Sequence, residues 1–194
     1  MSLLVGNAFW MTWNTILALV PLLLAWLIFG KRERPVWLLI IGAAAFVVFL
    51  PNAPYVLTDV LHLPGDLAVA HGNPWLVAAL LTQYLCLFAI GFGAYVVALV
   101  RLQRWLTARG VSRRSVIIID LALHALCAVG IVIGRVFRFN SWDVVADPGG
   151  LLELVRIPQP RTVLVLLALF GILAVGAALA RALPTIMNRA RSLV

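Results

Sequence analysis

Five long apolar runs make up most of this chain and constrain its fold more than any other feature of the sequence. They cover Asn7–Gly30, Val36–Leu50 with a weaker continuation to Leu63, Trp75–Val100, Ser115–Val136 and Thr162–Leu183. A helix needs about 20 apolar residues to cross the ~30 Å hydrocarbon core of a bilayer, and a backbone in lipid must satisfy its own hydrogen bonds. We therefore predict an all-α, polytopic transmembrane helix bundle of about five spans, forming a single transmembrane domain over residues 1–194.

Composition and charge favour lipids as partners. Apolar residues make up 64% of the chain and the mean hydropathy is +1.08, whereas soluble domains are about 45–50% apolar. The formal net charge of +8 could indicate nucleic-acid binding, but the basic residues flank apolar runs and have no soluble domain to display them. We predict membrane lipids as partners and no nucleic acid, because a basic residue near anionic headgroups contributes about 1 kcal/mol.

The positions of Lys and Arg predict the orientation. Most of them follow the first, third and fifth apolar runs. The basic residues on the other side are Arg135, Arg138, Arg156 and Arg161. Short loops rich in Lys and Arg stay in the cytoplasm. We therefore predict a multi-pass protein of the cell (plasma) membrane, with the N-terminus outside and the C-terminus in the cytoplasm.

The second run is interrupted where its polar residues begin. Pro51 and Pro54 lack an amide proton and crowd the preceding turn, so we predict a span that is broken at Pro51–Pro54. Beyond the break, Tyr55, Asp59 and His62 recur at helical spacing and would share one face. The simpler alternative is a proline kink with an interfacial turn. We favour a binding site, because ionisable groups inside a membrane are costly and usually functional.

A second polar stripe runs along the fourth apolar run. Its members fall within about a quarter turn of one another and are Asp120, His124, Cys127, Arg135 and Arg138. Asp120 and His124 are one turn apart and can hydrogen-bond as a pair. We interpret this pair as a structural contact rather than a proton relay, because two groups do not make a path across ~30 Å.

Polar residues are dense beyond the outer end of the fourth run, where Arg135 and Arg138 precede the string Asn140-Ser-Trp-Asp143. Arginine binds carboxylate or phosphate through two parallel hydrogen bonds. Two interpretations have equal weight. Either an arginine pairs with Asp59 or Asp143 and ties the second and fourth spans together, or the arginines hold an anionic headgroup. We predict that Asp59, His62, Arg135 and Asp143 meet in one network, because pairing lowers the cost of charges in a membrane.

Several strings in the sequence resemble a known family. They are Trp13-Asn14, Pro51-Asn52-Ala53-Pro54-Tyr55 with Thr58-Asp59 and His62-Leu63, and Gly134-Arg135 with Arg138 and Asn140-Ser141-Trp142-Asp143. Over nearly the whole chain the sequence is similar to domain of unknown function 1361, a family of small bacterial and archaeal multi-spanning membrane proteins. The resemblance implies a membrane location and this fold class. It implies no activity, and it suggests that the two outer polar clusters belong together.

The favoured function is an integral membrane protein with a polar site at the outer membrane face. That site would bind a lipid headgroup or a metal, with catalysis on a lipid or lipid-linked substrate as a further hypothesis. Asp59 and His62 are the candidate catalytic residues and the candidate metal ligands. The candidate binding residues are Asn52, Tyr55, Arg135, Arg138, Asn140 and Asp143. A headgroup ranks above a metal, because the arginines would repel a cation.

Two alternatives belong to other functional classes. The chain could be a channel or transporter subunit for an ion, a proton or a small solute, and five spans without inverted halves would then need a homo-oligomer. It could instead be a structural or accessory membrane subunit. The sequence contains none of the recognised catalytic motifs, such as HExxH or G-x-S-x-G. Whether the protein is an enzyme therefore stays open, and the sequence specifies no cofactor.

Overall fold

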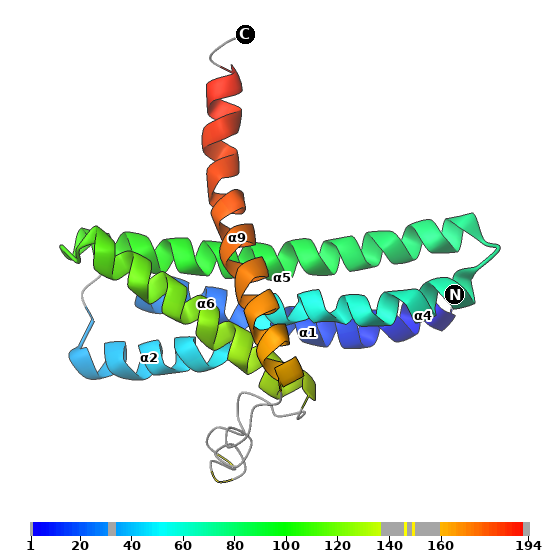
Figure 1. Ribbon diagram of the computed structural model, residues 1–194, viewed down its shortest axis with the longest axis horizontal. Helices are drawn as coiled ribbons and strands as arrows, with labels where there is room; N and C mark the ends of the chain where they lie inside the picture. Colours follow the sequence, from blue (N-terminus) through cyan, green and yellow to red (C-terminus); the bar gives the residue numbers. More distant parts are fainter. Residues whose placement is uncertain (1, 31–33, 137–145, 147–148, 150–159, 192–194) are drawn as a thin grey trace. The chain divides into compact units, whose positions relative to one another are not determined.

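The computed structural model describes residues 2–30, 34–136, 146, 149 and 160–191, and these residues form helices joined by short connections (Figure 1). Within the described residues, five helical segments are long and apolar enough to cross a membrane. They are Leu3–Ile28, Val36–Ala70, Pro74–Ala108, Arg113–Arg135 and Pro160–Ala182. The predicted all-α class with five spans is confirmed. The chain forms two compact units, Met1–Trp105 and Leu106–Val194, and the single transmembrane domain stays a prediction.

The first unit is built around α1. Its elements are α1 (Ser2–Ile28), α2 (Val36–Phe49), α3 (Asn52–Tyr55), the 3₁₀ helix η1 (Val56–His62), α4 (Leu63–Ala70) and most of α5 (Pro74–Ala108). Helix α1 contacts α2, α3 and η1, so the second span lies along α1 (Figure 1). The turn into α5 uses Gly72, whose φ of 88° lies in the left-handed region that glycine tolerates. Asn73 then caps α5 by accepting a hydrogen bond from the Leu76 amide at 3.1 Å.

The first unit has two chemically different ends. The polar end is where α1 and α5 begin and α4 finishes. There the Gln83 side-chain amide donates a hydrogen bond to the Leu4 carbonyl at 3.1 Å. The basic end is where α1 finishes and α2 begins, and Arg101 and Arg104 of α5 lie at this end. There the Phe29 ring packs against Phe46 and Trp105, with centroid distances of 5.1 and 5.3 Å.

The predicted interruption of the second span is confirmed, and it takes the form of a change in hydrogen bonding more than a change in direction. The helical path changes from α2 to α3, then to the 3₁₀ helix η1 and to α4, yet the segment bends by only 14°. Pro51 and Pro54 supply no amide proton, and the Ala53 amide bonds the Leu50 carbonyl at 3.2 Å. The Asn52 side chain donates to the Phe49 carbonyl at 3.0 Å. Short local bonds of this kind keep the backbone satisfied without a sharp kink.

Helix α5 packs on the second span through a close approach at Gly91. A Cβ atom added there would overlap the Val56 side chain and lie 2.8 Å from the Ala53 carbonyl oxygen. Ala53 and Val56 are themselves fully buried. The buried face of α5 continues in both directions at helical spacing through Leu80, Tyr84, Leu87, Ala94, Ala98 and Leu102. The core of the unit therefore lies between α5 and the interrupted span.

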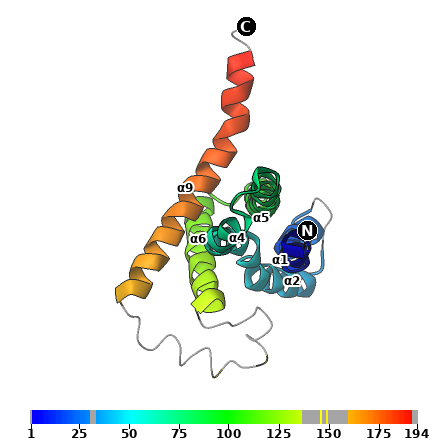
Figure 2. The same ribbon diagram turned by 90° about the vertical axis from the view of Figure 1, so that its right-hand side faces the viewer.

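In the described part of the second unit, two long helices pack against each other, α6 (Arg113–Val136) and α9 (Pro160–Arg191), as Figure 2 shows. The Ser112 hydroxyl accepts the Ser115 amide at 3.2 Å and caps α6. The buried residues of this pair include Leu123, Cys127 and Ile131 on α6, with Leu173 and Ala177 on α9. Cys127 belongs to the predicted polar stripe of the fourth run, and it is fully buried.

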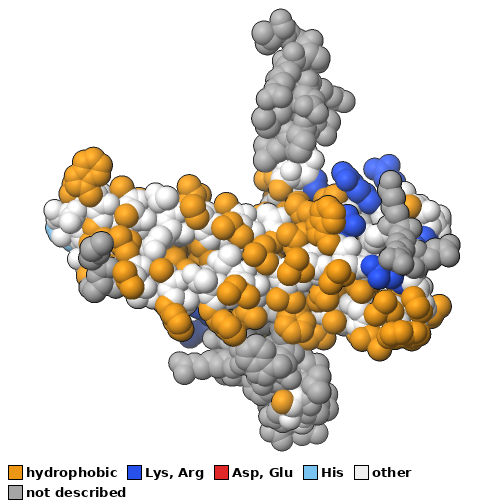
Figure 3. Space-filling model, turned by 180° about the vertical axis from the view of Figure 1, so that it is seen from behind, with side chains coloured by type: hydrophobic (Ala, Val, Ile, Leu, Met, Phe, Trp, Pro, Cys, Tyr) orange, Lys and Arg blue, Asp and Glu red, His pale blue; other side chains and the backbone are white. Residues whose placement is uncertain are grey.

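Large apolar side chains cover much of the surface. Phe9 and Trp75 are each 85% exposed, and Figure 3 shows apolar side chains over the length of the helices with Lys and Arg gathered toward one end. Soluble proteins rarely expose such continuous apolar surface. Lipid chains solvate these side chains in a membrane, so the surface agrees with a multi-pass membrane protein.

Candidate functional site

A buried carboxylate lies deep in the first unit. Asp59 of η1 is 1% exposed, and its Oδ2 accepts a hydrogen bond from the Asn14 side chain of α1 at 2.9 Å. Asn14 is about 17 Å along the helix from the start of the Leu3–Ile28 segment. The pair therefore lies near the middle of the span rather than at its end. A buried acid at this depth is costly unless it is hydrogen-bonded.

A second carboxylate lies closer to the polar end. Asp66 of α4 accepts hydrogen bonds from the Asn7 side chain at 2.6 Å and from the Tyr84 hydroxyl at 2.8 Å, both on Oδ2. Asn7 is in turn held by the Trp10 indole, which donates to its Oδ1 at 3.2 Å. Three spans thus meet at Asp66. Asn7 and Asn14 are seven residues apart, so the two acidic layers are separated by about 10 Å along α1.

Aromatic rings lie beside these layers. The Trp10 ring contacts the His62 ring at 5.5 Å and the Tyr84 ring at 6.2 Å. The imidazole of His62 therefore lies next to the hydrogen-bonded group around Asp66. We call Asn7, Trp10, Asn14, Asp59, His62, Asp66 and Tyr84 the polar cluster.

A groove runs between the first halves of α1 and α5, and none of its lining residues belongs to the polar cluster. It has a volume of about 550 Å³ and is lined mostly by small and apolar residues, among them Ala8, Met11, Thr12, Ala79, Thr82 and Gln83. Thr12 and Thr82 are exposed, so the groove opens at the surface of the unit. The Gln83 side-chain oxygen is buried and has no hydrogen-bond partner among the described residues.

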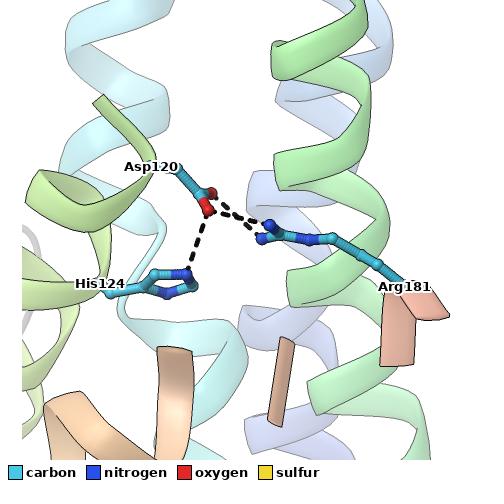
Figure 4. A network of polar contacts seen from close by, with 3 residues as sticks. All are labelled: Asp120, His124 and Arg181. Carbon is cyan, nitrogen blue, oxygen red and sulfur yellow. Dashed lines mark hydrogen bonds and ion pairs between the residues drawn. The ribbon is translucent and has the colours of Figure 1, made fainter. Parts of the chain in front are cut away.

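The second unit contains a separate charged group, which Figure 4 shows. The Arg181 guanidinium of α9 binds the Asp120 carboxylate of α6 through two hydrogen bonds of 2.8 and 3.1 Å. His124 Nε2 lies 3.5 Å from Asp120 Oδ2, so the predicted Asp120–His124 pair is present. His124 is 1% exposed. The two-pronged ion pair ties α6 to α9, which supports a structural contact over a proton relay.

The sequence model of the family described as "Protein of unknown function (DUF1361)" matches residues 13–176. The chain belongs to the DUF1361 family. No curated protein and no solved structure matches it. The region matched by the DUF1361 family contains Asn14, Asp59 and Asp120, whereas Asn7 and Arg181 lie outside it. Since DUF1361 has no described activity, the function must be argued from the residues of this member.

The change to a 3₁₀ helix alters the predicted polar face in this DUF1361 protein. Residues three apart eclipse in such a helix, so Asp59 and His62 stay on one side of η1. Tyr55 ends α3, before η1 begins, and is about a third of a turn away from Asp59 in the tighter winding. The Tyr55 carbonyl accepts a hydrogen bond from the Thr58 hydroxyl at 2.7 Å. The Asn52 side chain donates its hydrogen bond to the Phe49 carbonyl of α2.

The structure does not place the remaining predicted site residues relative to the polar cluster. Arg135 is in the second unit, and Arg138, Asn140 and Asp143 lie outside the described residues. The meeting of Asp59 with Arg135 and Asp143 stays a prediction. The described residues contain no group of three or more His, Cys, Asp or Glu that could hold a metal ion, and the metal role of Asp59 and His62 also stays a prediction.

Sequence reasoning missed five members of the polar cluster and one member of the charged group. Asn7, Trp10 and Asn14 are spaced by three and four residues in the first apolar run, and this helical spacing could have identified a polar stripe on α1. Asp66 and Tyr84 carry no such signal. Arg181 was counted among the residues that flank a span, although it pairs with an acid inside the membrane segment.

Proposed function

We propose that the protein binds the polar headgroup of a membrane lipid or lipid-linked substrate at the polar cluster. The observation that carries the proposal is the Asn14–Asp59 pair, a buried carboxylate held near mid-span by a hydrogen bond of 2.9 Å. An apolar residue would join α1 to η1 at lower cost, because burying a carboxylate carries a large desolvation penalty. An acid kept at this depth marks a functional group.

The groove between α1 and α5 fits the apolar part of such a ligand. Its mostly apolar lining suits an acyl or prenyl chain, and its lining residues on α1, from Ala8 to Ile16, span the same levels of the helix as Trp10 and Asn14 of the polar cluster. Small-molecule sites commonly combine apolar walls with a few convergent polar groups. The buried Gln83 oxygen is a hydrogen-bond acceptor for a hydroxyl or amide of the ligand.

The roles predicted for the other residues complete the proposal. Asp59 and His62 act as general base and acid if the protein is catalytic, because a carboxylate and an imidazole can exchange protons with a hydroxyl in reach. Arg135 and Arg138 bind the phosphate of the headgroup, with Asn52, Tyr55, Asn140 and Asp143 as further contacts. In this scheme the polar end of the first unit faces the outside of the cell membrane, as the Lys and Arg distribution predicts.

A second candidate is a path for protons or cations. It is favoured by the two acidic layers, which lie about 10 Å apart, and by His62, which lies beside the layer around Asp66. This path would need a homo-oligomer to continue across the membrane. The two candidates differ in a measurable way. A headgroup site retains a lipid and leaves liposomes tight, whereas a path makes reconstituted liposomes leak protons or potassium in a manner that depends on Asp59.

Retained lipid tests the proposal. Protein purified in mild detergent is examined by native mass spectrometry, with thermal unfolding measured on the same samples. Wild-type protein should carry a bound lipid, Asp59→Asn should lose most of it, and the control Leu61→Ala should keep it. Leu61 is on the same 3₁₀ helix and is 69% exposed. Wild-type protein without lipid, or equal retention in Asp59→Asn, would count against a headgroup site.

Exchanging the two residues of the Asn14–Asp59 pair distinguishes a role in ligand binding from a role in holding α1 against η1. The double variant Asn14→Asp/Asp59→Asn keeps one amide and one carboxylate in contact but moves the charge from η1 to α1. If the pair serves only to join the helices, both the unfolding temperature and the retained lipid should survive. If Asp59 contacts the ligand, lipid should be lost at an unchanged unfolding temperature. Asp59→Asn alone decides the matter if the swapped protein does not fold.

A further inference from the structure

An arginine at the basic end of the first unit is held in an unusually defined position. Arg101 of α5 donates a hydrogen bond from Nε to the Ala25 carbonyl of α1 at 3.1 Å. Its guanidinium carbon lies 3.9 Å above the centre of the Trp26 ring. Two contacts, one polar and one with an aromatic face, therefore fix the plane of the guanidinium.

The contacts leave the outer edge of the guanidinium available. Nε is the atom that binds Ala25, and among the described residues neither terminal nitrogen of Arg101 has a hydrogen-bond partner. No acid is paired with Arg101 in that part of the chain either. The two terminal nitrogens form the fork that binds phosphate or carboxylate through parallel hydrogen bonds.

The position of Arg101 along α5 matches a headgroup layer. It is the first charged residue after the run Trp75–Val100, and that run of 26 residues extends about 39 Å, enough to cross the ~30 Å hydrocarbon core. Trp26 is 57% exposed, and tryptophan side chains settle at the membrane–water interface. Arg104 follows one turn later and is exposed.

We propose that Arg101 and Trp26 form a binding site for the phosphate of an anionic phospholipid at the basic end of the first unit. The fork of Arg101 binds the phosphate oxygens, and the exposed Trp26 ring lies against the start of the acyl chains. Ala25 and Trp26 fix the guanidinium in advance, so little side-chain entropy is lost on binding. The site is separate from the polar cluster and does not depend on the proposed headgroup function there.

Lipid titration tests the site in the whole protein. Delipidated protein in detergent is titrated with phosphatidylglycerol or phosphatidylcholine, and bound lipid is counted by native mass spectrometry. Arg101→Gln should weaken phosphatidylglycerol binding by about 10-fold or more, as expected for a charge-assisted, two-pronged contact. The matched control Arg104→Gln removes the same charge one turn away and should change binding by less than about 3-fold. Equal effects of the two substitutions would show a diffuse basic surface and overturn the proposal.

Two further measurements identify which part of the lipid the site recognises. Arg101→Lys keeps the charge but loses the fork and the stacking plane, so it should bind almost as poorly as Arg101→Gln. Wild-type affinity in Arg101→Lys would overturn the geometric argument. Inorganic phosphate at millimolar concentration should fail to displace phosphatidylglycerol. Full displacement would assign the site to a free phosphate, and equal affinity for phosphatidylcholine would remove the requirement for an anionic lipid. Thermal unfolding of each variant excludes a loss of binding through unfolding.

Discussion

A methyl group added at Gly91 should destabilise the first unit, whereas the same change at Gly93 should not. A Cβ atom at Gly91 would overlap the Val56 side chain and lie 2.8 Å from the Ala53 carbonyl oxygen, while one at Gly93 has nothing within 4 Å. The carbonyl belongs to the backbone of α3 and cannot rotate away. Helix α5 must therefore move from the interrupted span to accept the methyl group.

The size of the effect follows from two opposing contributions. Overpacking a dense site costs about 1–3 kcal/mol, and replacing glycine by alanine inside a helix gains up to about 1 kcal/mol. The gain is common to both positions, so the free energies of unfolding of the two variants should differ by about 1–3 kcal/mol. At about 2–4 °C per kcal/mol for a chain of this size, Gly91→Ala should unfold about 2–12 °C below Gly93→Ala.

Circular dichroism in detergent measures both unfolding temperatures. The double variant Gly91→Ala/Val56→Ala provides a check, because it removes one of the two overlapping groups and should recover part of the loss. The coupling between these two changes should reach at least about 0.5 kcal/mol. An unfolding temperature of Gly91→Ala equal to or above that of Gly93→Ala would refute the close approach of α5 to α3 and η1.

Two other predictions concern the ion pair and the orientation. Asp120→Asn and Arg181→Gln should each lower the free energy of unfolding by about 1–3 kcal/mol, because either change leaves the other residue unpaired. The double variant should lose less than the sum of the two single losses. Additive losses, measured by thermal unfolding, would contradict a direct pair. In a cysteine-free background, a cysteine at His71 should react with a membrane-impermeant maleimide from outside the cell, and one at Arg109 only after the membrane is opened. Labelling of the Arg109 position from outside would reverse the orientation.

The fold class could be predicted because hydrophobic length alone determines it. Each apolar run is long enough to span a bilayer, the second one when its continuation to Leu63 is included, and helices are the structure that satisfies the backbone there. The break at Pro51 and Pro54 was also visible in the sequence, since proline acts locally. What the prolines could not reveal was the 3₁₀ winding of η1 or the small bend of 14°. Those depend on how Asn52 and the neighbouring amides share the remaining carbonyls.

The polar cluster was only half predictable, for a different reason. Asp59 and His62 stand on one short element, so their relation follows from local spacing. The partner of Asp59 is Asn14, 45 residues earlier, and the partners of Asp66 are Asn7 and Tyr84, 59 residues earlier and 18 residues later. Such pairings depend on which helices lie side by side, and periodicity within one helix carries no information on that. The same holds for Asp120 and Arg181, which are 61 residues apart.

The two proposed lipid contacts cannot belong to one lipid molecule. Tyr84 of the polar cluster and Arg101 are 17 residues apart on α5, which corresponds to about 25 Å along the helix. This separation approaches the ~30 Å thickness of the hydrocarbon core, so a headgroup beside Tyr84 and Asp66 and a headgroup at Arg101 would belong to opposite leaflets, with the Asn14–Asp59 pair at a level between them. If both proposals hold, native mass spectrometry should find two lipids on each wild-type chain. Asp59→Asn should then remove one of these lipids and Arg101→Gln the other. Loss of the same lipid in both variants would mean that the two ends of the first unit are coupled.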